Sequence, residues 1–263
     1  MKNIAGNVAI VTGSASGVGA ATALLLAMQG CHVVINYSRS KEAAQLVAQQ
    51  CQGRGVEVLL CQADVADDEQ CRAMVEQAIT KWGRVDILVN NAGTTKFCDH
   101  HQLEGLDAKD FQKIYAVNVV GPYQMIRAVA PSMQSNEGGG VVVNVASTAA
   151  ITGIGSSVAY AASKGALVTM GLSLARALGP QIRINTVCPG FIQGDWLRQG
   201  LGDQQYEAAK LHNERNAPLG VTADADTVAE SILFFILGPK IVTGETLIVD
   251  GGRHLNSVPL ARR

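Results

Sequence analysis

The chain has 263 residues, of which 48% are hydrophobic and 16% charged, a composition that allows one large α/β domain or two small ones with a sizeable core. Its net charge of −1 provides no basic field, so we expect no nucleic-acid partner and no attraction to acidic lipid. No signal-peptide core opens the chain and no apolar stretch approaches about 18 residues, which predicts no membrane span and a cytoplasmic protein.

Apolar, strand-like runs alternate with helical patterns along most of the chain. Strands are expected at 8–11, 33–36, 56–62, 86–90, 141–145, 182–187 and 246–249. Helices are expected at 20–28, 42–50, 67–82 and 160–178, and largely across 106–133, where Pro122 should kink or interrupt the helix. The alternation predicts the α/β class: a single Rossmann-type domain over 1–263, with a doubly wound, parallel, seven-stranded sheet and helices on both faces.

The region at about 190–226 is polar and departs from the strand–helix rhythm. We expect an insertion with one helix around 204–213, and we interpret it as a lid over the substrate, because long insertions in compact domains are often functional. We interpret His212 on this helix as a solvated residue rather than a substrate contact.

The six cysteines are scattered without a C-x-x-C pair. The segment Cys98-Asp99-His100-His101 lacks a second cluster at zinc spacing. We therefore expect reduced thiols and no metal site.

A glycine-rich turn, VTGSASGVG, joins the first expected strand to the first helix. Glycine allows a tight turn and a close backbone approach to a pyrophosphate, whose charge is met by the helix N-terminus. The spacing is G-x-x-x-G-x-G rather than the commoner G-x-G-x-x-G, but the strand–turn–helix context supports a nucleotide site. The expected cofactor contacts at this turn are Gly13, Ser14, Ser16, Gly17, Val18 and Gly19.

The end of the second strand predicts which nicotinamide nucleotide binds. It reads Asn36-Tyr37-Ser38-Arg39, and no carboxylate follows until Glu42. A carboxylate there would bind the ribose 2′-hydroxyl of NAD and repel a 2′-phosphate, whereas Arg39 and the Ser38 hydroxyl would bind that phosphate. We predict NADP(H), with contacts from Tyr37, Ser38 and Arg39; NAD(H) is the alternative if Arg39 is only a solvated loop cation.

Two further motifs follow expected strands. Asp64-Val65 comes after the third strand, and Asn90-Asn91-Ala92-Gly93 after the fourth. Ligands of open α/β sheets bind at the carboxyl ends of the strands. We therefore expect cofactor contacts from Asp64, Val65, Asn91, Ala92 and Gly93.

A tyrosine and a lysine stand one helical turn apart in YAASK, at Tyr160 and Lys164. Residues four apart on a helix share a face, and a nearby cation favours the charged form of a phenol and so lowers its pKa. Ser147 follows the fifth strand, and Asn118 lies on the preceding helix. Two hydroxyl donors aimed at one carbonyl oxygen would stabilise the negative charge that develops there during reduction.

The motifs occur in the order TGSASGVG (12–19), DV (64–65), NNAG (90–93), Asn118, Ser147, YAASK (160–164) and PG (189–190). Together they resemble the classical short-chain dehydrogenase/reductase family over nearly the whole chain. The resemblance is nearest to 3-oxoacyl-carrier-protein reductases and glucose-dehydrogenase-like members.

The resemblance implies a role for each candidate catalytic residue. Tyr160 would be the general acid in carbonyl reduction and the general base in alcohol oxidation, and Lys164 would depress its pKa and hold the nicotinamide ribose. Ser147 would polarise the substrate carbonyl, and Asn118 would position a water in a proton relay. The resemblance also adds Pro189, Gly190 and Ile192 to the cofactor site. The family usually forms tetramers, which the apolar stretches 166–178, 233–236 and 246–249 would suit.

The expected substrate pocket is mostly apolar, which suits a carbonyl with hydrocarbon or ring character, although several of its residues would equally suit core or interface packing. It comprises Thr94, Thr95, Thr148, Ala149, Ile154, Phe191 and Trp196. The segments 137–140 and 179–181 carry no basic residue for an acidic carrier protein, so we favour a small-molecule ketone or secondary alcohol. The alternatives are a 3-oxoacyl-carrier-protein reductase, an NAD(H)-dependent sugar, polyol or cyclic-alcohol dehydrogenase, and an inactive nucleotide-sensing regulator.

Overall fold

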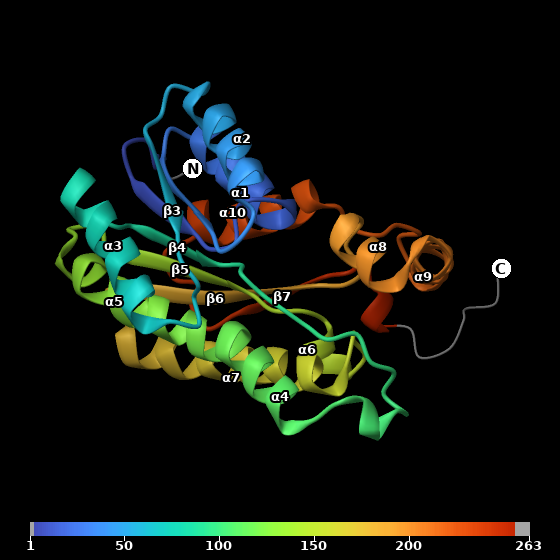
Figure 1. The fold of residues 1–263 in the computed structure, drawn as a ribbon. Helices are drawn as coiled ribbons and strands as arrows, with labels where there is room; N and C mark the ends of the chain where they lie inside the picture. Colours follow the sequence, from blue (N-terminus) through green and yellow to red (C-terminus); the bar gives the residue numbers. More distant parts are fainter. Residues whose placement is uncertain (1–2, 256–263) are drawn as a thin grey trace.

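The fold is described for residues 3–255 by a computed structural model. A single seven-stranded sheet has the strand order β3-β2-β1-β4-β5-β6-β7, and every neighbouring pair is parallel (Figure 1). The strands are β1 Val8–Val11, β2 His32–Tyr37, β3 Val58–Gln62, β4 Ile87–Asn90, β5 Gly140–Val145, β6 Ile182–Pro189 and β7 Thr246–Val249. The predicted parallel, seven-stranded α/β domain is confirmed.

Helices cover both faces of the sheet (Figure 1). One face carries α1 (Gly17–Met28), α2 (Lys41–Gln52) and α10 (Ala225–Leu237). The other carries α3 (Asp68–Trp82), α5 (Gly121–Ser135) and α7 (Val158–Leu178). Successive strand residues alternate between the two cores, because side chains point to opposite faces of a strand. In β1, Ala9 and Val11 join the first core and Ile10 the second.

Capping residues account for both ends of α3. Asp67, expected as the first residue of a helix, is instead the N-cap of α3, where its carboxylate accepts from the backbone N–H groups of Glu69 and Gln70. Gly83 ends α3 with φ +75°, a left-handed conformation that favours glycine. The last strand and the first strand have the bounds expected from sequence.

The expected interruption near Pro122 is confirmed. It takes the form of a π-helical turn, Ala116–Val120, between α4 (Ala108–Tyr115) and α5. Proline has no N–H to donate to the preceding turn, so the hydrogen-bond ladder is free to widen there. The widened turn holds Asn118 with only 1% of its surface exposed.

The region at about 190–226 contains two helices rather than the one expected: α8 (Asp195–Leu201) and α9 (Asp203–Asn216). Both lie beyond the carboxyl ends of the strands (Figure 1). Tyr206, a buried residue of α9, connects the two helices. Its hydroxyl accepts from the N–H of Gly194, the N-cap of α8, at 3.1 Å. His212 lies exposed on α9, as expected.

Among the described residues, α7 alone has the length and hydropathy that would let a helix cross a membrane. Core helices of globular proteins share this signature, and α7 packs on the sheet through buried Leu167, Gly171 and Ala175. The six cysteines are all free thiols, and five of them are buried.

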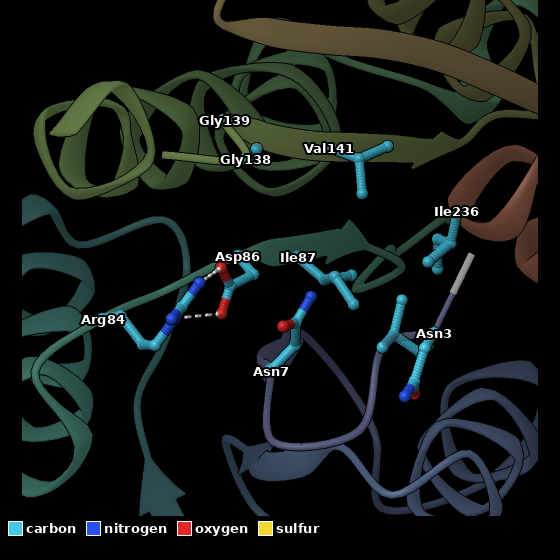
Figure 2. Close-up of a pocket in the computed structure, with 11 residues that line it drawn as sticks. Asn3, Asn7, Arg84, Asp86, Ile87, Gly138, Gly139, Val141 and Ile236 are labelled. Atoms are coloured by element: carbon cyan, nitrogen blue, oxygen red, sulfur yellow. Dashed lines mark hydrogen bonds and ion pairs between the residues drawn. The ribbon is translucent and has the colours of Figure 1, made fainter. Parts of the chain in front are cut away.

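A pocket lies at the amino ends of β1, β4 and β5 (Figure 2). Asp86 in this pocket accepts both arms of the Arg84 guanidinium, at 2.9 and 2.6 Å, and also the N–H of Val8 and the amide of Asn136. Its oxygens are therefore fully used in holding β1 beside β4, and the pocket is part of the scaffold at the edge opposite the site described next.

Candidate functional site

The site lies at the carboxyl ends of β1, β4, β5 and β6. The chain builds β1, β2 and β3 outward in one direction and then crosses back to place β4 on the other side of β1. Such a reversal leaves a crevice beyond the strand ends, which is where open α/β sheets bind ligands.

The turn after β1 is pressed against the segment after β4. Gly13 has φ +62°, and a Cβ added there would lie 2.9 Å from the Cα of Ala92. A Cβ on Gly19 would overlap the Gly13 carbonyl oxygen. Only glycine permits this packing, so the structure brings the predicted turn residues together with the Asn91–Ala92 motif.

Hydrogen bonds from Thr12 and Asn91 lock these two segments together. The Thr12 hydroxyl accepts from the N–H groups of Asn91 and Ala92, both at 3.0 Å. The Asn91 amide donates to the carbonyls of Thr12 and Gly13, at 2.9 and 3.1 Å. Two segments that lie 79 residues apart in sequence are thereby held together.

Two buried residues brace the turn from below. The Ser14 hydroxyl donates to the Val11 carbonyl at 2.7 Å and accepts from the Asn36 N–H at 2.9 Å, with the whole residue inaccessible. The Asn36 side chain accepts from the Gly13 N–H at 3.0 Å and donates to the Ala63 carbonyl at 3.0 Å. Ser14 thus holds the turn rather than presenting its hydroxyl to a cofactor, and Asn36 is a bracing residue that sequence reasoning did not assign.

The N-terminus of α1 fits a pyrophosphate. Its N-cap, Ser16, makes no side-chain capping bond, no acidic residue occupies the first turn, and Ser16 and Gly17 are exposed. The first N–H groups of the helix are therefore free to meet an anion. Ser38 and Arg39 are exposed at the carboxyl end of β2, and Asp64 is exposed beyond β3, along the same edge of the sheet.

Tyr160 and Lys164 stand on the first turns of α7, where the sequence places them. The N-cap Ser157 accepts from the Tyr160 N–H at 3.2 Å and so fixes where the helix begins. Lys164 is 4% exposed, and its Nζ donates to the Val145 carbonyl at the end of β5 at 2.8 Å. Ser147, two residues beyond that carbonyl, hydrogen-bonds the Tyr160 hydroxyl. The predicted serine, tyrosine and lysine are thus brought together.

Asn118 joins the site through its side chain. Its amide donates to the Thr94 carbonyl at 2.9 Å and to the Ser163 hydroxyl at 3.0 Å, and its oxygen accepts from the Thr94 N–H at 2.8 Å. Asn118 therefore ties the loop after β4 to α7, and its expected role in positioning a water stays a prediction.

Burial dominates the electrostatics of the tyrosine–lysine pair. Desolvation raises the pKa of Tyr160 to about 12, against the smaller lowering effect of the Ser147 hydrogen bond. Desolvation also lowers the pKa of Lys164 to about 8. In the chain by itself burial therefore outweighs any lowering of the Tyr160 pKa, and the expectation that Lys164 depresses it stays a prediction. The ammonium is engaged by Val145 and lies 5.7 Å from the phenol ring centroid.

The expected substrate residues differ in where their side chains lie. Trp196 faces the site, with its ring centroid 6.3 Å from that of Tyr160. Thr95, Thr148 and Phe191 make internal contacts: Thr95 with Ser156 at 2.8 Å, Thr148 through its N–H to the Pro189 carbonyl at 2.8 Å, and Phe191 with the Tyr206 ring at 5.3 Å. Ala149 is buried, whereas Ile154 is 72% exposed.

The structure gives roles to residues that the sequence analysis left without one. Thr12, Ser157 and Ser163 hold the motif residues through hydrogen bonds, and Phe97 packs beside Trp196 with ring centroids 5.6 Å apart. Ser163 lies within YAASK and Ser157 three residues before it, so the sequence could have suggested a capping or hydrogen-bonding role for both. Phe97 gives no such signal, because a single aromatic residue in a loop is uninformative.

Comparison with known proteins agrees with this geometry. The sequence profile of a family described as "Enoyl-(Acyl carrier protein) reductase" matches residues 13–254. The chain is 36% identical to a Streptomyces violaceoruber protein named as a candidate ketoacyl reductase of the granaticin polyketide synthase, over 94% of this chain and 96% of that protein. It is 30% identical to the 3-oxoacyl-[acyl-carrier-protein] reductase FabG of Staphylococcus aureus, over 94% and 98% of the two chains.

A solved structure from Burkholderia xenovorans, described as a candidate short-chain dehydrogenase/reductase, superposes with a TM-score of 0.87. The two share 37% identity over 95% of this chain and 98% of that one. The profile match runs from Gly13 in the glycine turn past Ser147, Tyr160 and Lys164. The chain therefore belongs to the short-chain dehydrogenase/reductase family and is an oxidoreductase of that type.

Proposed function

We propose that the protein is an NADP(H)-dependent oxidoreductase that interconverts a small-molecule ketone and a secondary alcohol, with Tyr160 as the general acid and base. The observation that carries the proposal is the convergence of Ser147, Tyr160 and buried Lys164 beside the glycine turn. Nicotinamide, when bound, supplies or accepts the hydride.

Tyr160 and Ser147 perform the proton chemistry. In reduction, both hydroxyls donate hydrogen bonds to the carbonyl oxygen, and Tyr160 transfers its proton as negative charge develops there. The raised pKa keeps Tyr160 protonated at neutral pH, the form from which it can donate a proton. The nearby Lys164 ammonium then stabilises the phenolate that remains, because a cation counters the desolvation of a buried anion.

The preference for NADP(H) rests on the end of β2. Arg39 and Ser38 are exposed there without a neighbouring carboxylate in the segment 36–41, so they can meet a 2′-phosphate. The remaining proposed contacts with the nucleotide come from the glycine turn, without the buried Ser14 hydroxyl, and from Asp64, Val65, Asn91, Ala92, Gly93, Pro189, Gly190 and Ile192. NAD(H) is the alternative cofactor.

A 3-oxoacyl-carrier-protein reductase is a second candidate, favoured by the similarity to the Staphylococcus aureus enzyme. The segments 137–140 and 179–181 offer no cation for an acidic carrier, and for this reason we prefer a free substrate. An acetoacetyl thioester offered free and on the acidic carrier protein separates the two, since strong preference for the carried form would favour the carrier-dependent reaction.

A homotetramer is also proposed. Leu172 on α7 and Phe234 on α10 are each more than half exposed, and apolar faces of this kind need covering. A cytoplasmic location stays a prediction.

Replacing Tyr160 by phenylalanine removes the proton donor while keeping the ring. We expect kcat for ketone reduction to fall by about 10²- to 10⁴-fold, the usual worth of general acid catalysis, with NADPH affinity largely kept. Nicotinamide absorbance reports the rate and NADPH fluorescence the binding. Tyr123→Phe, the same change at an exposed position on α5, is the matched control, and an active Tyr160→Phe enzyme would refute the assignment.

The pH dependence of kcat/KM should report the ionisation of Lys164. With its pKa near 8, Lys164 is charged below that pH and neutral above it, whereas Tyr160 stays protonated until about pH 12. We therefore expect kcat/KM for reduction, which reports the free enzyme, to decline as pH rises through about 8. Lys164→Met should be slow throughout and lack this step. A wild-type rate that climbs through pH 8 contradicts the assignment.

Arg39→Asp should reverse the cofactor preference. We expect KM for NADPH to rise by about 10- to 100-fold, the range for loss of a charge-assisted hydrogen bond, with KM for NADH unchanged or lower. Arg54→Asp, an exposed arginine in the turn after α2, controls for net charge. A wild-type enzyme that prefers NADH would show that Arg39 is only a solvated cation.

The proposed tetramer predicts a mass near four times 27.6 kDa by light scattering. Leu172→Glu places a charge on an apolar face of α7 and should shift the mass toward smaller species. Arg72→Glu, on the exposed side of α3, should not. A wild-type monomer would exclude the proposal.

A further inference from the structure

The ring of Tyr160, the proposed proton donor, lies near two further aromatic rings that come from separate segments. Trp196 of α8 lies between Phe97, in the loop after β4, and Tyr160 on α7. Its ring centroid is 5.6 Å from that of Phe97, with planes inclined by 52°, and 6.3 Å from that of Tyr160, inclined by 43°. Tilted rings at such distances attract one another. We call Phe97 and Trp196 the aromatic wall.

The aromatic wall is built into the fold on both sides. Phe97 packs directly on the backbone of α8 at Gly200, where an added Cβ would overlap the ring. Its loop is fastened at the neighbouring residues: the Cys98 N–H donates to the Ser156 carbonyl at 2.9 Å, and Lys96 pairs with Asp110 at 2.7 Å. The ring of Phe97 is therefore held in place by the loop and by α8.

The aromatic wall leaves indole surface uncovered. Trp196 is 50% exposed although its ring faces Tyr160. Uncovered aromatic surface is costly in water, and a ligand ring that stacks on it gains both apolar burial and ring–ring attraction. Gly155 also lies against Tyr160, where an added Cβ would be 3.3 Å from the phenol ring, so Gly155 itself places no side chain beside that ring.

The two cations nearest to the aromatic wall in sequence are already paired. Lys96, next to Phe97, is bound to Asp110, and Arg198, two residues after Trp196, is bound to Asp203 at 2.9 Å and to Glu207 at 2.7 Å. Neither cation is free for a carboxylate or phosphate on the substrate. The wall therefore suits an uncharged ring.

We propose that Phe97 acts with Trp196 as a specificity determinant, selecting ketones that carry a planar aromatic ring, with the ring against the wall and the carbonyl at Tyr160. The inference rests on the proposed ketone reduction and narrows its substrate class. Phe97 positions the Trp196 indole and lends a second ring face, so its removal should weaken ring preference without removing the chemistry.

The test compares two ketones that differ in the planarity of the ring, 1-phenylpropan-2-one and 1-cyclohexylpropan-2-one. In both the carbonyl is separated from the ring by a methylene, so conjugation does not alter its reactivity. With NADPH, we expect wild-type kcat/KM to favour the phenyl ketone by about threefold to tenfold, the range for an added aromatic pair. Phe97→Leu and Trp196→Leu should bring the ratio near one, while Tyr123→Leu, the loss of an exposed aromatic ring on α5, should leave it unchanged.

A binding measurement separates this inference from the proposed function. The chain has two tryptophans, so Trp82→Phe leaves Trp196 as the only reporter of indole fluorescence. Titration with 1-phenylpropan-2-ol and 1-cyclohexylpropan-2-ol should show the same preference for the phenyl compound, lost when Phe97→Leu is added.

The outcomes are distinct. If no ketone is turned over but the fluorescence preference is present and depends on Phe97, the proposed function fails and the aromatic wall stands. If ketones are reduced but the two rings are equal, or Phe97→Leu keeps the preference, the inference is overturned and the proposed function is untouched. Circular dichroism shows whether Phe97→Leu is folded. If Phe97→Leu loses both ring preferences because it does not fold, the kinetic ratio of Trp196→Leu decides between these results.

Discussion

The hydrogen bond from the Lys164 ammonium to the Val145 carbonyl is the constraint on which the rest of the site depends. It draws a cation into the core at the point where β5 ends and α7 begins. The bond fixes α7 against the sheet, so Tyr160 one turn earlier and Ser147 just beyond β5 must face each other. Burying an ammonium beside a single carbonyl costs free energy because the charge loses its hydration, and this desolvation lowers the pKa of Lys164.

Much of the scaffold could be predicted from sequence, because strands buried on both faces and capped amphipathic helices carry their own patterns. Val8–Val11 and Thr246–Val249 have the expected bounds, and Asp67 marks the start of α3 to within one residue. Helix α10 was not recognised, since its apolar end, SILFFIL, also suits a buried strand or an interface. Helix α8 was missed because it is short and lies between Gly194 and Gly202.

The residues of the candidate site could be predicted from sequence, but the pKa of Tyr160 could not. The order of the motifs and the family resemblance placed Ser147, Tyr160 and Lys164 together, but a pKa depends on the three-dimensional environment. Lysine proximity suggested a lowered pKa for Tyr160, whereas burial raises it. Asn36 and Phe97 escaped notice for a related reason: one is a polar residue inside an apolar strand, the other a loop aromatic, and each acquires its role only from distant partners.

The two halves of the site are held by different forces, and this difference bears on what can vary. The nucleotide side consists of strand ends joined by backbone hydrogen bonds and glycine contacts, as between Thr12 and Asn91, where any Cβ or lost bond disturbs several segments. The substrate side consists of short helices and a loop held largely by ring packing on Trp196 and Tyr206. Side-chain packing tolerates exchange of one apolar group for another better than a backbone network tolerates a missing bond. Substrate choice can therefore change on this fold while the hydride chemistry is kept.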